Sequence, residues 1–395
     1  MKKIILACSA DISTNERVHL FAHSLTNAGY SVRVISFKTY YNRPLPFVEY
    51  KVNRIHIFFF EGILGKINRL ISYFFYLLSK KAKVIVCMDQ GALIPVLLVH
   101  AIKRTQIVFD YSGNYLDSKI SGAQWQNDIH SILFKWFHNC FKCIIPSSQK
   151  IREVLLASGR NATVPIYDLP LEGNYERFSK NFNEVYEDAF WNVPPKGYDF
   201  WLLRRIILAF LNQEKRKVIL YIGPIEKNLG LEALVRSMEY VDDACLLMIG
   251  TGKYYEELKY KVKRWTFWEK VLMPGIVRYD QLREFIPLTD LGICLGHSAL
   301  MEMNINVSFS FARFLHSGIP VVTNVGSETN QLLVEYHAGN SIEFTNPEQI
   351  GKQLNEVLKG NDTLIKWKEG AKKFAKKMDW NQQEKIFLDI FKQLG

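Results

Sequence analysis

A glycine turn followed by a lysine is a feature of the second half of the sequence that could bind an anion. Residues 220–238, LYIGPIEKNLGLEALVRSM, indicate a buried strand, a turn and an amphipathic helix. Gly223 allows the backbone to turn tightly, and Gly230 begins the helix, whose first amides favour a negative charge. Lys227 lies between the two glycines and can place a positive charge beside a diphosphate. A structural strand–helix turn without a ligand would have the same pattern, so both interpretations stay open.

Three more segments have the same character. Residues 245–252 end in Gly250-Thr251-Gly252, and residues 271–277 contain Pro274-Gly275 at the end of an apolar strand. Residues 307–333, VSFSFARFLHSGIPVVTNVGSETNQLL, combine an apolar helical run that breaks at a glycine, a β-branched strand and a polar turn. Arg313 lies in the middle of that helical run. Each segment alone is generic, but their order and spacing are not.

The elements that must position these segments alternate regularly. Strand-like runs are predicted at 3–9, 31–37, 83–88, 105–111 and 143–148, and again at 217–223, 245–252, 271–277, 291–296 and 319–325. Continuous apolar strands separated by helices predict parallel sheets that are covered on both faces. We therefore expect an α/β protein with two doubly wound, Rossmann-like domains. Ligands of such sheets bind beyond the carboxyl ends of the strands, so we expect the site in the cleft between two facing sheets.

Composition narrows the class of partner. Hydrophobic residues make up 48% and charged residues 23% of the 395 residues, which predicts a buried core. The net charge of +11 favours anionic partners such as phosphorylated ligands or acidic lipid surfaces. We expect no nucleic acid partner, because no nucleic-acid-binding signature stands out. The six cysteines indicate small core residues in a reducing compartment. Cys140 and Cys143 have the spacing of a metal-binding pair, but no second pair completes a site, so they do not predict a metal.

Two apolar segments are rich in basic residues. No stretch approaches the roughly 20 residues of a membrane span, and the N-terminal run does not indicate a signal peptide. Residues 65–83 and 197–217, however, mix large apolar side chains with lysine or arginine, as an interfacial helix would. For both segments the alternative is a helix packed on a sheet.

Taken together, the segments resemble a known family. The order GPIEKNLG, MIGTG, PGIV, DLGICL and SGIPVVT, with Glu328 beyond it, resembles the donor-binding domain of GT-B glycosyltransferases, most closely the retaining family 4 type. The first half resembles the acceptor domain of bacterial members at residues 10–37, 87–98, 108–117 and 144–155. Residues 378–394 resemble the helix that crosses back to the first domain.

The resemblance implies a GT-B fold with defined parts. We expect an N-terminal acceptor-side domain at 1–185, a linker or apolar basic insertion at 186–216, a donor-binding domain at 217–375 and a returning helix at 376–395. The implied activity is transfer of a sugar from a UDP- or GDP-linked donor with retention of configuration. The nucleotide sugar is the substrate, and neither a cofactor nor a metal is expected.

The resemblance also implies the donor site. Lys227, Glu302 and Arg313 are the implied catalytic residues. The implied donor-binding residues are Gly223, Gly250, Gly275, Val277, Ser308, Ser310, Phe311 and Glu328. Transfer is expected to depend on stabilising charge on the diphosphate more than on a dedicated base.

Several positions depart from the family pattern. Arg313 stands where the family has a glutamate that binds ribose, and Glu302 is the nearest carboxylate to a second expected glutamate. Ser310 and Leu229 stand where basic residues are expected. In one hypothesis the enzyme is active, and Arg313 binds phosphate while Glu302 reaches a sugar hydroxyl. In another, the chain is a catalytically weak partner in a polysaccharide-assembly complex. A GT-B sugar-nucleotide epimerase would need more carboxylates than we find.

On the acceptor side, Asp11, Arg17 and Asp89 fall at predicted strand ends or in the first turn of a helix. We expect them to face the cleft, with helix capping or local pairing as the alternative. Asn114 stands in a region where bacterial relatives commonly carry His-Glu. A glycolipid or polysaccharide acceptor, peripheral contact with an anionic membrane and a location in the cytoplasm at its inner face suit an apolar, basic surface.

Overall fold

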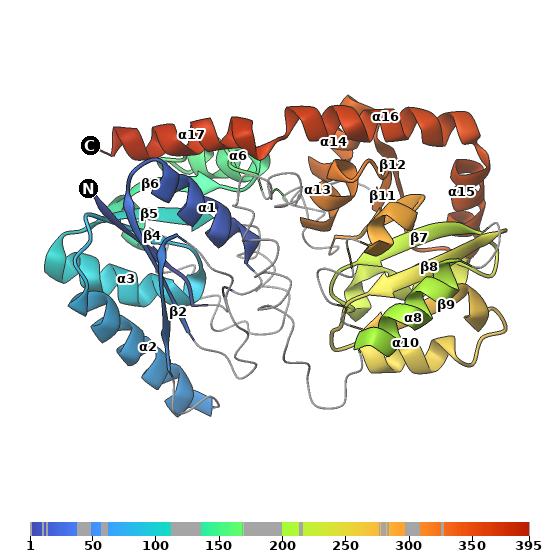
Figure 1. Ribbon diagram of the computed structural model, residues 1–395, viewed down its shortest axis with the longest axis horizontal. Helices are drawn as coiled ribbons and strands as arrows, with labels where there is room; N and C mark the ends of the chain where they lie inside the picture. The colour runs from blue at the N-terminus through green and yellow to red at the C-terminus, as the bar shows by residue number, and fades with distance from the viewer. Residues whose placement is uncertain are drawn as a thin grey trace. The chain divides into compact units, whose positions relative to one another are not determined.

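The chain folds into two compact units. The computed structural model describes residues 2–9, 12, 15–37, 49–56, 62–111, 136–167, 169, 200–212, 216–275, 277, 282, 284–296, 309–324 and 328–394. The first unit is Met1–Val193 with Trp380–Gly395, and the second is Pro194–Asp379. Each contains a six-stranded sheet (Figure 1).

In the first unit the strands are all parallel and lie in the order β3-β2-β1-β4-β5-β6. Apolar residues fill the central strands, which are buried on both faces. The strands are β1 (Lys3–Ala7), β2 (Ser31–Phe37), β3 (Lys51–Ile55), β4 (Val84–Cys87), β5 (Gln106–Tyr111) and β6 (Phe141–Pro146). The helices are α1 (Glu16–Asn27), α2 (Gly62–Ser79), α3 (Gln90–Lys103), the 3-10 turn η2 (His138–Cys140), α6 (Gln149–Ala157) and α17 (Trp380–Gln393).

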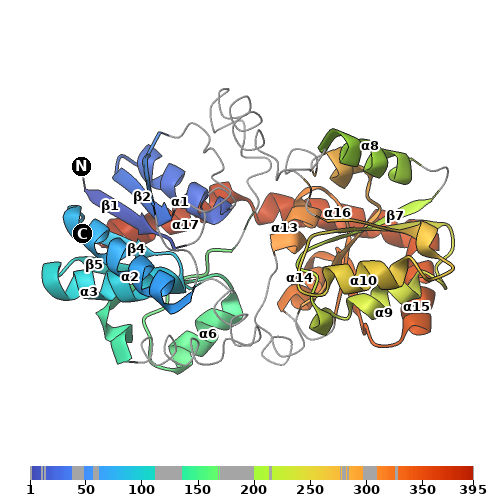
Figure 2. The ribbon, with the colours of Figure 1, turned by 90° about the horizontal axis from the view of Figure 1, so that it is seen from below.

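Helices cover both faces of this sheet. Figures 1 and 2 show α2 and α3 on one face and α1 and α17 on the other. The last helix, α17, belongs to this unit although it follows the whole second unit in sequence. Phe387 stacks on Phe21 of α1 with ring centroids 4.2 Å apart, and Trp380 Nε1 donates to Ser24 Oγ at 3.1 Å.

The second unit repeats the arrangement. Its parallel strands lie in the order β12-β11-β10-β7-β8-β9, which is the order of the first sheet when each set is numbered along the chain. The strands are β7 (Lys217–Ile222), β8 (Ala244–Ile249), β9 (Val271–Gly275), β10 (Leu291–Cys294), β11 (Val321–Asn324) and β12 (Gly339–Ile342).

Helices surround this second sheet as well. They are α8 (Phe200–Leu211), η3 (Lys227–Leu229), α9 (Leu231–Ser237), α10 (Tyr255–Val262), η4 (Trp268–Lys270), η5 (Ile286–Leu288), α13 (Phe309–His316), α14 (Glu328–Tyr336), α15 (Pro347–Lys359) and α16 (Asn361–Lys377). Helix α8, which lies in the segment expected to be a linker or insertion, belongs to this unit and contacts β9.

Two properties of the described part of the chain bear on the sequence expectations. No helix in it combines the length and the apolar character needed to cross a bilayer. None of the six cysteines forms a disulfide, and all except the half-buried Cys140 are buried.

Candidate functional site

The strand order of the second sheet reverses between β7 and β10. These strands are neighbours, and Ile293 of β10 pairs with Tyr221 of β7. The residues that follow them, Gly223 and Leu295, therefore emerge at the same carboxyl edge. Doubly wound sheets bind ligands at such a reversal, because the loops after the two strands diverge there. We take this edge as the candidate donor site.

The loops after β7 and β8 pack directly on each other. Gly223 N donates to Ile249 O at 3.1 Å, and Ile225 N donates to Thr251 O at 3.0 Å. Gly250 has φ +145°, and a Cβ there would lie 1.9 Å from Gly223 O. Only glycine fits this close approach of two backbones. The packing of the two loops therefore explains why residue 250 is a glycine. A contact between Gly250 and the donor stays a prediction.

Lys227 lies in the turn after β7 but leans toward α10. Its side chain is 64% exposed, and Nζ lies 2.7 Å from Glu257 Oε2. The hydrogen bond from Lys227 lowers the pKa of Glu257 below its ordinary value. Leu229, where the resemblance expects a basic residue, is instead buried in the hydrophobic core.

Helix α13 begins beside the end of β10. Ser310 Oγ lies 3.7 Å from Cys294 Sγ, so the first turn of the helix is at the carboxyl edge. Phe311 is fully buried in the unit. Because α10 follows β8 and α13 lies by β10, on the other side of β7, none of the contacts described here joins Lys227 to Ser310.

The end of α13 explains the glycine in its sequence. Gly318 has φ +72°, its N–H donates to Leu315 O at 3.0 Å, and Ile319 N donates to Phe314 O at 2.9 Å. This paired bonding is the Schellman motif, which requires a left-handed residue after the helix. The turn leads the chain directly into β11.

Arg313 is only 3% exposed, so its charge is removed from bulk water. A buried guanidinium is costly unless hydrogen-bond acceptors or anions compensate it, which fixes its position strongly. Val277 is also buried, just beyond β9, whose last residue Gly275 has φ +86° and accepts a hydrogen bond from Gly250 N at 2.9 Å. A nucleobase contact of Val277 stays a prediction.

Sequence reasoning missed Asn324, which joins the ends of β10 and β11. Its Oδ1 accepts from Gly296 N at 2.9 Å and its Nδ2 donates to Gly296 O at 2.8 Å. Thr323 Oγ1 donates to Cys294 O at 2.7 Å. These side chains set the direction in which the chain leaves β10, toward the candidate site. A polar Thr-Asn pair at the end of an apolar strand was the available signal.

On the acceptor side, two predicted residues have local partners. Arg17 Nε and Nη2 donate to the two carboxylate oxygens of Asp110 at 2.8 and 2.7 Å, and Nη1 donates to Ile166 O at 2.7 Å. Asp89 caps α3 by accepting from Ala92 N at 3.0 Å, and also accepts from Ser9 N and Oγ. The alternative of pairing and capping describes both residues.

The remaining predicted site residues lie partly or wholly outside the described part of the chain. Asp11, Asn114, Glu302 and Ser308 lie outside the described residues. Glu328 begins α14, but its side chain also lies outside the description. Among the residues that are described, no group of three or more His, Cys, Asp or Glu side chains could hold a metal ion.

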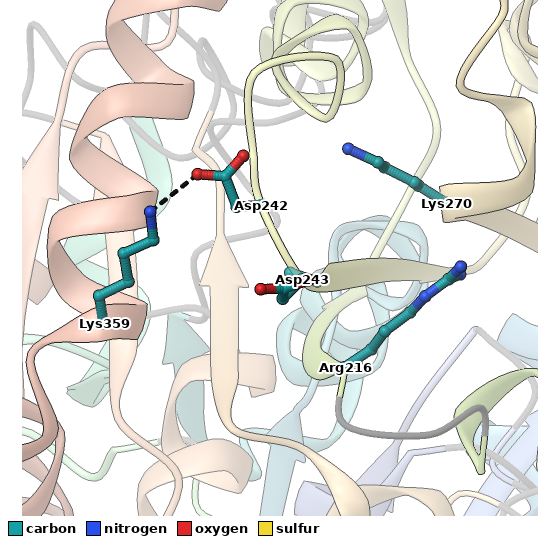
Figure 3. Close-up of a pocket in the computed structure, with 6 residues that line it drawn as sticks. Arg216, Asp242, Asp243, Lys270 and Lys359 are labelled. Atoms are coloured by element: carbon teal, nitrogen blue, oxygen red, sulfur yellow. Dashed lines mark hydrogen bonds and ion pairs between the residues drawn. The ribbon is translucent and has the colours of Figure 1, made fainter.

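A polar pocket of about 450 Å³ opens at the opposite, amino-terminal edge of the second sheet (Figure 3). Its lining residues are Arg216, Asp242, Asp243, Ala244, Lys270 and Lys359. Lys359 pairs with Asp242 at 2.8 Å, and Lys270 Nζ donates to the carbonyls of Met238 and Val241 after α9. These contacts satisfy backbone and side-chain groups at helix and strand ends. Ligands of doubly wound sheets bind at the carboxyl edge, so this amino-terminal pocket is not the candidate site.

Comparison with known proteins gives the class. Residues 205–374 match the family Glycosyl transferases group 1. Together with two sheets of doubly wound order, this match defines a glycosyltransferase of GT-B fold. The segment of residues 205–374 therefore has the pattern of the glycosyl transferases group 1 family, as the sequence predicted. Comparison with curated protein sequences gives no significant match.

Solved structures share the fold over the whole chain. Sucrose-phosphate synthase (tll1590) from Thermosynechococcus elongatus aligns with a TM-score of 0.76 at 13% identity, covering 100% of this chain and 99% of that chain. Anabaena Alr3699/HepE in complex with UDP-glucose aligns with a TM-score of 0.72 at 13% identity, covering 100% of both chains. The lipopolysaccharide outer core galactosyltransferase WaaB aligns with a TM-score of 0.56 at 13% identity, covering 99% of both chains. At these identities the likeness shows the fold.

Proposed function

We propose that the protein transfers a sugar from a UDP- or GDP-linked donor to a glycolipid or polysaccharide acceptor, with retention of configuration. The reaction would serve bacterial cell-surface polysaccharide biosynthesis, at the inner face of a membrane. The observation that carries the proposal is the family match over the unit whose sheet reverses at Gly223 and Leu295. HepE, which shares the fold, was solved with UDP-glucose, and this favours a UDP-linked donor.

In this proposal the diphosphate binds at the carboxyl edge of β7 and β10. The first turn of α13, which includes Ser310 and Phe311, would offer backbone amides to the phosphate oxygens. Arg313 and Lys227 would supply positive charge, and Glu302 would bind a sugar hydroxyl. As the glycosidic bond to phosphate breaks, charge develops on the leaving diphosphate, and fixed donors and cations stabilise that charge. The first unit would bind the acceptor, as the resemblance to the acceptor domain implies.

A second function is favoured by Leu229 and Arg313. The core position of Leu229 leaves no basic side chain there, and Arg313 replaces an acid of the family. Both features suit a catalytically weak GT-B partner in a polysaccharide-assembly complex. Such a partner would bind another assembly enzyme and turn over no donor.

A thermal-shift screen against UDP- and GDP-linked sugars separates the two functions. The active enzyme should show a higher melting temperature with one donor class and slow hydrolysis of that donor, since binding to the folded state alone stabilises it. If no donor raises the melting temperature or is hydrolysed, while affinity capture recovers another assembly enzyme, the partner function replaces the enzymatic one.

A further inference from the structure

The outer face of α2 carries an apolar stripe from Leu64 to Phe75. Leu64, Ile67, Ile71 and Phe75 repeat at helical spacing, and their exposed fractions run from 46% for Ile71 to 76% for Leu64. On α3, which packs beside α2, Leu98 and Ile102 are likewise exposed. We call these six residues the α2–α3 face. Contiguous exposed apolar side chains mark an interaction surface.

The inner side of α2 packs firmly on the sheet. The exposure of its outer stripe is therefore not caused by a loosely docked helix. Tyr73 is fully buried, and its hydroxyl donates to Ile35 O at 2.7 Å and to Cys8 O at 3.0 Å. Leu77, one turn later, is also fully buried. The helix therefore has two apolar sides, and packing on the sheet accounts for only one.

Charge identifies the partner of the other side. Residues 62–109 contain seven lysines and arginines and a single acid, Asp89, whose carboxylate caps α3 and binds Ser9. Lys103 Nζ donates to Lys80 O at 2.9 Å and also to Leu78 O, which brings the C-terminal ends of α2 and α3 together. Five cations gather at these ends: Lys80, Lys81, Lys83, Lys103 and Arg104.

We propose that the α2–α3 face binds an anionic lipid bilayer, with the apolar stripe at the acyl boundary and the cations at the headgroups. This is how amphipathic helices bind in the membrane interface. A second copy of the chain would bring the same positive excess to the contact, whereas an anionic bilayer supplies the opposite charge. Helix α8 fits less well, because Arg204 beside its exposed Trp201 is paired with Glu284.

The inference deepens the proposed function, since it places a membrane surface on the unit expected to receive the acceptor, but vesicle binding requires no donor. Cosedimentation should show binding to phosphatidylcholine vesicles that contain phosphatidylglycerol, weak binding to phosphatidylcholine alone, and release in high salt. The double substitution Ile71→Ser and Phe75→Ser should lower the partition coefficient by about tenfold or more. Lys81→Glu should lower it on anionic vesicles only.

The matched control is Val154→Ser with Leu156→Ser on α6. These side chains are 47% and 45% exposed in the same unit, and their replacement should leave vesicle binding unchanged. The proposal is overturned if the Ile71/Phe75 variant binds anionic vesicles as strongly as the unaltered protein does, or if the unaltered protein does not bind vesicles. If light scattering gives the mass of one chain for this variant and a larger mass for the unaltered protein, the face mediates self-association instead. Donor-induced thermal shifts, measured on the same variants, report the proposed function separately.

Discussion

Arg17 and Asp110 form a bidentate, nearly buried ion pair, in which Asp110 is 1% exposed. The Arg17 guanidinium also donates to the carbonyl of Ile166. The pair joins α1 to the carboxyl end of β5. Removing one partner leaves the other charge buried without compensation. We expect Asp110→Ala to cost about 3–5 kcal/mol of folding free energy, measured by chemical denaturation. The exposed Asp389→Ala, which breaks the surface pair with Lys392, should cost less than about 1 kcal/mol. Similar losses for both variants would contradict this assignment.

Gly250→Ala should destabilise the second unit. The new methyl group would have to displace the carbonyl of Gly223, and the backbone at φ +145° disfavours any side chain. We expect a loss of about 2 kcal/mol or more in the free energy of unfolding, together with weaker donor binding. Gly159→Ala, in the left-handed region at φ +73° and with open space around its Cβ, gives the cost of a positive φ without a steric contact and should lose about 1–2 kcal/mol. Equal losses would show that the contact with Gly223 is unimportant.

Asn324→Ala should lower both the free energy of unfolding and the affinity for the donor. It removes both hydrogen bonds to the backbone of Gly296, where the chain leaves β10. Loss of partners for buried polar groups costs about 1–3 kcal/mol, which denaturation would measure. Titration calorimetry with the nucleotide should then show the lower affinity. Asn340→Ala, an exposed asparagine on the edge strand β12, serves as the control, and matching affinities for the two variants would remove Asn324 from the site.

Arg313→Ala tests the position at which the chain departs from its family. If the guanidinium binds the diphosphate, affinity for UDP should fall tenfold to hundredfold, because a hydrogen bond to a charged group is worth about 1.5–3 kcal/mol. Circular dichroism would confirm that the variant is folded. Arg264→Ala removes an exposed arginine from the same unit and should leave affinity unchanged. An Arg313 variant with unaltered affinity would assign the residue to folding alone.

His19 predicts a pH dependence of stability. Burial lowers its pKa from 6.5 to about 4, against the opposing effect of the hydrogen bond to Ile12 O. Between these values the unfolded chain binds more protons than the folded one, so stability should fall as the pH falls from 6.5 toward 4. At 1.36 kcal/mol per pH unit, the gap between 6.5 and about 4 is worth about 3 kcal/mol. Denaturation of His19→Gln should lose this part of the slope, and an unchanged slope would contradict the burial of a neutral imidazole.

Sequence patterns predicted the central strands because burial on both faces requires continuous apolar runs. They also predicted the edge strands β6 and β9, which are mostly buried, but not the edge strands β3 and β12, whose residues KVNRI and GNSI are only partly buried. The site shows the same division. The turn at Gly223 and the helix end at Gly318 are local signals and were readable. The partners of Arg17 and Asn324 lie 93 and 28 positions away in sequence, so only the fold reveals that these side chains are paired.

The position of α17 has a consequence for synthesis. Residues 1–193 leave the ribosome first, yet the aromatic surface of α1 around Phe21 is covered by Trp380 and Phe387, which are made only after the second unit. The N-terminal half of the chain therefore emerges with part of its core exposed and completes its packing last. Nascent chains released before residue 380 should recruit chaperones or aggregate through this surface, while the second unit folds on its own schedule.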